Sequence, residues 1–275
     1  MRHPSRRCRA WLAVGALLLF AVPIGCSTVA VTNRKQLDLI PASTMMSMSN
    51  QQYGDFLKAN ALSPNADQAA LVRTVGKRIQ GAVERYFRDE NMSDQLNGYD
   101  WEFNLIESKE ANAWCMPGGK VVVYSGILPI TRTETGLAVI LGHEIAHAVA
   151  EHGRERMSQQ LIAQFGGMAL AQALAQKPQQ TQQAWMTAFG LGTQYGALLP
   201  FSRLQENEAD HLGLIFMAMA GYDPNEALVL WQRMSENNSG QAPPEFMSTH
   251  PSDATRIARI TQEMPEAMRY FRETS

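Results

Sequence analysis

The stretch that most constrains this chain is residues 140–153, which read Ile-Leu-Gly-His-Glu-Ile-Ala-His-Ala-Val-Ala-Glu-His-Gly. His143 and His147 are four positions apart, so a helix places them one turn apart on the same face. Two imidazoles in that arrangement can point at one metal ion, and a neutral His nitrogen is a good ligand for zinc. The spacing therefore predicts a helix that carries two ligands of one metal site.

Glu144 follows His143 by one residue, about 100° around the helix, so it flanks the metal instead of binding it. A carboxylate in that place can act as general base on a water molecule that the metal activates. The pattern His143-Glu144-x-x-His147 is that of zinc peptidases, and its flanks are apolar on nearly all sides, which predicts a buried helix. Metzincins need Gly three residues and His six residues after the second His, but Ala150 and Gly153 stand there, so that class is excluded.

The third ligand must come from elsewhere, and three acids lie near the start of a second apolar helix, which we expect Ser202 to cap. Glu206 and Asp210 share one helix face, whereas Glu208 lies about 200° away from Glu206. Periodicity alone does not choose between Glu206 and Glu208 as the ligand. We expect Asp210 to accept a hydrogen bond from a ligating imidazole. Two His and one Glu would leave the open fourth position of hydrolytic zinc sites.

A small sheet is predicted beside the metal-binding helix. Residues 101–106 alternate between apolar and polar, residues 117–119 (Pro-Gly-Gly) predict a tight turn, and residues 121–124 are strongly β-prone. The segment 112–116 is a candidate edge strand, which could pair with the extended backbone of a substrate. The candidate substrate-binding residues on it are Asn112, Ala113 and Trp114. The predicted fold class is α+β, mainly helical.

Residues 154–200 are predicted to be mostly helical and are rich in Ala, Gly, Leu and Gln. Gly166 and Gly167 favour either close packing of two helices or a mobile hairpin. Membrane contact is an open alternative, although neither apolar run reaches spanning length without interruption.

The N-terminus has the pattern of a secretory signal. Residues 1–9 are basic, residues 10–24 are apolar, and no acid occurs before Asp38. Gly25-Cys26 resembles a bacterial lipobox, which predicts lipidation of Cys26, although Pro23 departs from that pattern. An uncleaved anchor is the alternative, and a mitochondrial transit peptide is disfavoured because such peptides are amphipathic.

We therefore expect three parts: a signal peptide at 1–25 that is removed, an arm and helix at 26–65, and a peptidase domain at 66–275. Ser27 after the Cys favours the bacterial outer membrane, with the protein anchored by lipid and facing the periplasm. The formal charge of −2 and the lack of a basic stripe exclude a nucleic-acid partner.

The motifs together resemble the M48 metallopeptidases, a likeness that runs from about residue 66 to residue 262. The residues that carry it are His143-Glu144-x-x-His147, Ser202-Arg203-x-x-Glu206-x-x-x-Asp210 and His250-Pro251. The match is closest to bacterial lipoprotein members and periplasmic quality-control proteases. The resemblance implies a zincin-like fold, one zinc ion, Glu206 as the third ligand, and a substrate-binding edge strand at 112–119.

The resemblance also places His250 near the metal and Arg256 at the substrate. His250 has two possible roles: it stabilises the oxyanion formed during peptide hydrolysis, or it occupies the fourth zinc position and holds the enzyme latent. The sequence does not choose between them.

The predicted function is zinc-dependent cleavage of misfolded or misassembled cell-envelope proteins, with Glu144 as general base. The alternative is an assembly factor or chaperone for outer-membrane proteins in which proteolysis is latent or secondary, working with the outer-membrane assembly machinery. A purely structural zinc site is disfavoured because it would give Glu144 no use.

Overall fold

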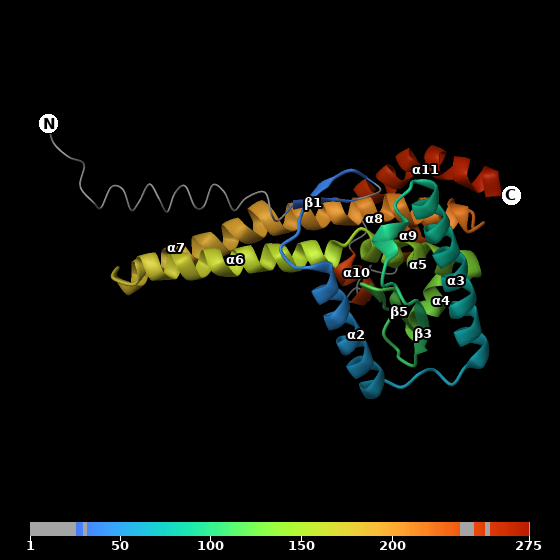
Figure 1. Ribbon diagram of the computed structural model, residues 1–275, viewed down its shortest axis with the longest axis horizontal. Coiled ribbons are helices and arrows are strands. Elements are labelled where there is room, and N and C mark those ends of the chain that lie inside the picture. The colour runs from blue at the N-terminus through green and yellow to red at the C-terminus, as the bar shows by residue number, and fades with distance from the viewer. Residues whose placement is uncertain (1–25, 30–31, 237–244, 251–253, 275) are drawn as a thin grey trace.

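The computed structural model describes residues 26–29, 32–236, 245–250 and 254–274 (Figure 1). It is an α+β fold, mainly helical with a small sheet, as predicted. The sheet consists of β3 (Glu102–Ile106), β4 (Ala113–Met116) and β5 (Lys120–Tyr124). β5 lies in the middle, parallel to β3 and antiparallel to β4. β4 is therefore an edge strand of this sheet.

The longer helices are α2 (Ala42–Ala59), α3 (Ala66–Asp89), α5 (Glu134–Val149), α6 (His152–Leu174), α7 (Gln179–Thr193), α8 (Leu199–Met219), α9 (Glu226–Glu236) and α11 (Ala254–Thr274). The short elements are β1 (Cys26–Thr28), β2 (Lys35–Leu37), α4 (Leu128–Thr131), α10 (Glu245–Thr249), the 3₁₀ turns η2 (Ser93–Leu96) and η3 (Ser125–Ile127), and the π-helical η4 (Gln194–Leu198). The predicted signal peptide, residues 1–25, lies outside the described residues.

The sheet is buried on both faces. Val121 and Val123 of β5 belong to the main core, together with apolar residues of α3 and α5. Val122, which points to the opposite face because strand side chains alternate, packs in a second cluster with Tyr53 of α2. The sheet therefore lies between α2 on one side and the main core on the other.

The central feature of the core is a close crossing of α5 and α8, which lie next to each other in Figure 1. A Cβ on Gly142 would come within 2.8 Å of the Gly213 carbonyl oxygen, and a Cβ on Gly213 within 2.9 Å of the His143 nitrogen. Only two glycines allow the two backbones to approach so closely. The crossing brings the two predicted ligand-bearing helices together.

Two helix boundaries lie beside the predicted site. α5 ends at Val149, because Glu151 adopts a left-handed conformation (φ 57°) and α6 starts at His152 in a new direction. Ser202 does not cap α8, because the helix already begins at Leu199 and continues from η4.

α6 and α7 form a long helical hairpin that projects from the rest of the molecule (Figure 1). Gly166 of α6 lies against the ring of Phe189 of α7, where a Cβ would be 3.1 Å from the nearest ring carbon. The glycines thus allow close helix packing, which is one of the two alternatives that the sequence predicted. None of the described helices is both long enough and apolar enough to cross a membrane.

The close contact of α5 and α8 predicts that one added methyl group lowers stability at the crossing but not at an open helical glycine. We expect Gly213→Ala to lower the free energy of unfolding by about 1–3 kcal/mol, because the new Cβ forces α5 and α8 apart. Gly81 on α3 is a matched control, since a Cβ there meets nothing within 4 Å. Gly81→Ala should be neutral or stabilising by up to about 1 kcal/mol. Urea unfolding of both variants measures this, and an equal response of the two would contradict it.

Candidate metal centre

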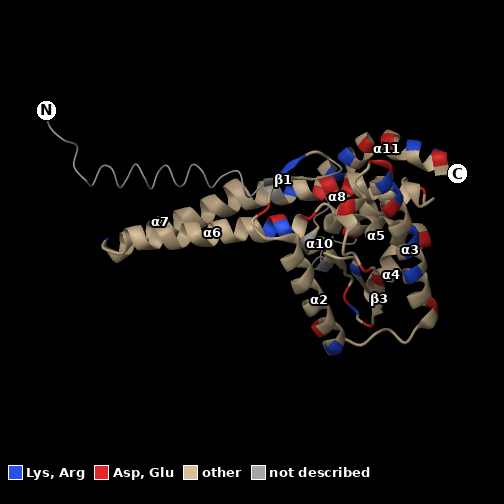
Figure 2. Ribbon diagram, in the orientation of Figure 1, with Lys and Arg blue, Asp and Glu red and all other residues tan. Residues whose placement is uncertain are grey.

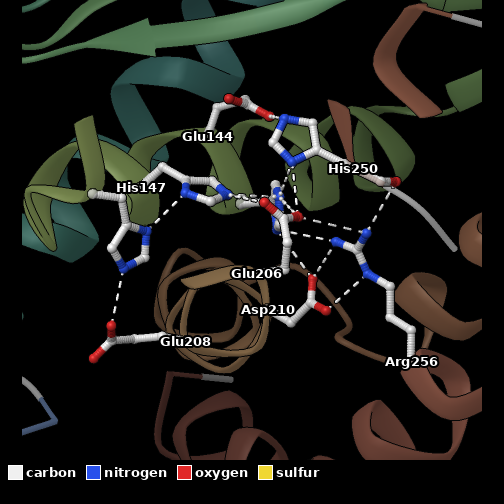
Figure 3. Close-up of polar contacts among 9 residues, drawn as sticks. Glu144, His147, Glu206, Glu208, Asp210, His250 and Arg256 are labelled. Carbon is white, nitrogen blue, oxygen red and sulfur yellow. Dashed lines mark hydrogen bonds and ion pairs between the residues drawn. The ribbon is translucent and has the colours of Figure 1, made fainter. Parts of the chain in front are cut away.

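Four side chains from three parts of the chain meet at one point (Figure 3). His143 and His147 come from α5, Glu206 comes from α8, and His250 follows α10. Each offers one nitrogen or carboxylate oxygen, and these four atoms all lie within 4.8 Å of one another. All four residues are buried. The sequence predicted three of these as ligands and left the role of His250 open.

The spacing of the donor atoms fits a zinc ion. Zinc–ligand bonds of about 2.0–2.1 Å in a tetrahedron place neighbouring donor atoms about 3.3 Å apart. The Nε2 atoms of His143 and His147 are 3.1 Å apart, and they lie 3.4 and 3.3 Å from the oxygens of Glu206. Two imidazoles and a carboxylate at these distances are a set that zinc prefers. The residues present therefore fit the metal.

His250 supplies the fourth donor atom of this cluster. Its Nδ1 lies 3.1 Å from His143 Nε2 and 2.8 Å from Glu206 Oε2. Its Nε2 lies 3.4 Å from Glu144 Oε1. One imidazole thus contacts both the predicted ligand set and the predicted base.

Glu144 is buried beside the donor atoms, on the helix turn predicted for it. Its Oε1 accepts no hydrogen bond from the described residues. Burial raises the pKa of this carboxyl, and the nearby His250 and His143 oppose the rise. A carboxylate with a raised pKa and no hydrogen bond to its Oε1 is suited to accept a proton from water.

A second set of contacts orients the imidazole of His143. Its Nδ1 lies 3.0 Å from Asp210 Oδ1, the contact that the sequence predicted for Asp210. Arg256 donates to both oxygens of Asp210 at 2.8 and 2.6 Å, and its guanidinium stacks 3.4 Å above the ring centre of Trp231. Although burial opposes the charge, Arg256 and His143 keep the pKa of Asp210 below its usual value.

His147 is held by a different chain of contacts. Its Nδ1 lies 2.7 Å from Nδ1 of His152, whose Nε2 lies 2.9 Å from Glu208 Oε2 (Figure 3). When Nε2 of His147 faces a metal, its Nδ1 carries the ring proton and donates a hydrogen bond to Nδ1 of His152. His152 then donates from Nε2 to Glu208, which fixes the tautomers of both rings. Burial lowers the pKa of both imidazoles, which favours this neutral state.

The N-terminal arm closes this chain of contacts. Arg34, between β1 and β2, donates from Nε to Glu208 at 2.8 Å and from Nη1 and Nη2 to Glu155 at 2.9 Å each. Thr32 also donates to Glu208. The predicted arm thus contacts the outer side of the metal centre.

The structure separates the two acids between which periodicity could not choose. Glu206 lies at the donor cluster, whereas Glu208 lies on the other side of α8 and holds His152. Arg256, expected at the substrate, is only 4% exposed and bonded to Asp210, although it also lines a cavity of about 420 Å³ beside Glu206.

The predicted substrate strand lies at the sheet edge, with Asn112 immediately before it. Ala113 is buried on the core side of β4, while Trp114 packs edge-to-face on Phe56 of α2, with ring centres 5.0 Å apart. Cys26, the predicted lipidation site, pairs with Leu37 in the β1–β2 hairpin. Its lipidation stays a prediction.

Sequence reasoning missed His152 and Arg34. A continuous helix would place His152 about 140° around the axis from His147. Only the break at Glu151 brings the two imidazoles into contact. The available signal was a third His at the end of an apolar helix, where a buried imidazole needs a partner. Arg34 gave no local signal, because its partners are more than a hundred residues away.

The contact between His152 and His147 generates a prediction. We expect His152→Ala to lower zinc affinity by about 10- to 100-fold, because His147 loses the partner that orients its ring. His211→Ala is the control, since His211 lies apart from the donor cluster and faces Glu263 and Glu266 at 4.0 and 3.9 Å. Competition with a chelator measures both affinities. Equal losses in the two variants would show that the effect is not specific to the site.

The chain is similar in sequence to several known proteins. Residues 75–264 match the model of peptidase family M48. The mitochondrial metalloendopeptidase OMA1 of Schizosaccharomyces pombe is 34% identical over 251 residues, which cover 90% of this chain and 68% of that protein. The mitochondrial metalloendopeptidase OMA1 of Saccharomyces cerevisiae is 28% identical, covering 98% of this chain and 77% of that protein. The β-barrel assembly-enhancing protease of Escherichia coli is 29% identical, covering 58% and 33%.

These relatives correct the predicted location. The bacterial relative matches less of the chain than the two fungal ones, and proteins matched with both higher identity and higher coverage are mitochondrial. The prediction of a lipid-anchored protein in the bacterial outer membrane is therefore wrong on this comparison. It relied on a short N-terminal pattern, which carries less information than similarity over most of the chain.

The family model covers most of the chain and includes both ligand-bearing helices and His250. M48 peptidases use zinc, in agreement with the donor set found here. This chain belongs to peptidase family M48 and is a zinc metalloendopeptidase.

Proposed function

We propose that the chain cleaves extended segments of misfolded or misassembled proteins, with zinc held by His143, His147 and Glu206. The observation that supports this most directly is the buried Glu144 carboxylate beside a zinc-sized cluster of donor atoms. Zinc in this position supplies Lewis acidity toward a water molecule and toward the scissile carbonyl. Glu144 accepts the proton of the attacking water and later delivers it to the leaving amine.

Substrate binding along β4 is part of this proposal. β4 is the sheet edge, so backbone groups on its outer side are not used by the pairing with β5. An extended peptide can add to such an edge through main-chain hydrogen bonds, which tolerate many side chains. Such binding suits unfolded segments better than folded surfaces. The narrower prediction of cell-envelope substrates has support only from the bacterial relative, whose name refers to β-barrel assembly.

We further propose that His250 keeps the enzyme latent in the state described here. Of the two roles left open by the sequence, latency agrees better with its distances. Nδ1 lies among the donor atoms, where a water molecule must enter, and Nε2 lies toward the base Glu144. Activity then requires His250 to move away from Glu206.

The alternative function is an assembly factor or chaperone whose proteolysis is secondary. The blocked fourth position favours it, because a protein that spends most of its time latent can act by binding. The name of the bacterial relative points in the same direction. A purely structural zinc site is disfavoured, because it would not need a buried carboxylate beside the donor atoms.

The role of Glu144 is tested by Glu144→Gln. We expect kcat/KM on an unfolded protein substrate to fall by about 100- to 10,000-fold, because the amide cannot accept the proton. Zinc content should stay at that of the wild type, since Glu144 is outside the donor set. Activity near the wild-type value would contradict the proposal. If the same variant rescues every defect of a deletion strain, the assembly role is the main one.

The role of His250 is tested by His250→Ala. We expect peptidase activity to rise, because the fourth corner of the donor set becomes accessible to water. The double variant Glu144→Gln/His250→Ala must be inactive, which excludes a contaminating protease. A fall in activity of the single variant, measured on protein that still binds zinc, would favour the oxyanion role instead.

A further inference from the structure

The α6–α7 hairpin exposes large apolar side chains far from the metal centre. Those at least half exposed on α6 and α7, and on η4, which continues α7, are Ile162 (50%), Phe165 (63%), Met168 (63%), Trp185 (58%), Leu191 (53%) and Tyr195 (65%). No residue of α7 is buried. An apolar surface of this extent is unusual on a soluble protein and indicates a docking surface.

The exposed apolar residues follow helical spacing. Ile162, Phe165 and Met168 recur every third residue on α6. Leu191 and Tyr195 lie four residues apart, about one helical turn, so they share a face of the second arm, and Trp185 lies about 80° around the helix from Tyr195. Each arm of the hairpin therefore presents a short apolar stripe. The stripes lie along the middle part of α6 and from the middle of α7 into η4, and they are not a chance group at the tip of the hairpin.

The charge of the hairpin identifies the class of partner. No Asp or Glu occurs between Glu155 and Glu206, and Figure 2 shows the hairpin almost entirely without charged residues. The charges in that interval are Arg156 and Arg203 at the base and Lys177 at the tip, all exposed. No ion pair involves these three cations within the described part of the chain. Apolar stripes with cations at both ends and no acids complement a surface of acyl chains and phosphates.

We propose that the α6–α7 hairpin docks onto an anionic phospholipid bilayer, with its apolar stripes against the acyl chains and its cations at the phosphates. Trp185 and Tyr195 have the amphipathic rings that favour the membrane–water interface. Ten glutamines lie within residues 157–202, so polar amides run along the whole hairpin. The hairpin therefore lies in the plane of the interface. This role is independent of peptide cleavage.

Fluorescence quenching by brominated phosphatidylcholine tests the contact at one residue. Every protein in this experiment is the full chain with Trp11→Phe, which removes the tryptophan fluorescence of the N-terminal apolar segment. With vesicles that also contain phosphatidylglycerol, we expect strong quenching, most of which disappears in Trp185→Phe. Trp101→Phe is the control, because Trp101 packs against Gly119 and not on the hairpin. Unchanged quenching in Trp185→Phe would overturn the proposal.

A second measurement excludes the loss of fold and the other occupants. Phe165→Gln/Trp185→Gln/Tyr195→Gln should reduce the fraction of protein that sediments with phosphatidylglycerol-containing vesicles at least about tenfold. Leu39→Gln/Leu62→Gln/Val229→Gln changes three exposed apolar residues elsewhere and should have no effect. Zinc content checks that both variants fold. A lipid-free dimer that only the hairpin variant dissociates would show that a second copy covers this surface, and would reject the lipid partner.

Discussion

The site depends on the close contact between α5 and α8. The donor atoms of His143 and Glu206 lie on different helices, and zinc requires them about 3.3 Å apart. Side chains of ordinary size between the helices would keep the axes about 8–10 Å apart and the donor atoms too distant. Gly142 and Gly213 remove that obstacle directly beside the first ligand. The two glycines thus allow the approach of the helices that brings the donor atoms together.

Around this contact, the chain balances its buried charges in two separate networks. Arg256 pairs with Asp210 on one side of α8, and Arg34 is shared between Glu155 and Glu208 on the other. A buried charge without a partner costs several kcal/mol, so each network is stable only when complete. Because Arg34 belongs to the N-terminal arm, correct docking of that arm is part of the site. The imidazoles of His143 and His147 are each oriented by one network.

What the sequence predicted follows from local periodicity. The i, i+4 pair His143 and His147, the edge strand at 112–116 and the shared face of Glu206 and Asp210 all depend on the geometry of a single element. The contacts of His152 depend instead on one left-handed residue, Glu151, in a context where no glycine marks the break. Arg34 and the glycine crossing join segments far apart in the sequence, which periodicity cannot detect. The predicted location was wrong for a different reason, because a short N-terminal pattern was weighted above the whole chain.

The projecting hairpin is continuous with the site. α6 begins at His152, the partner of His147, and Glu155 follows in its first turn. The returning arm runs through η4 into α8, which carries Glu206 and Glu208. Both ends of the hairpin therefore bear residues of the metal centre or of the network that orients it.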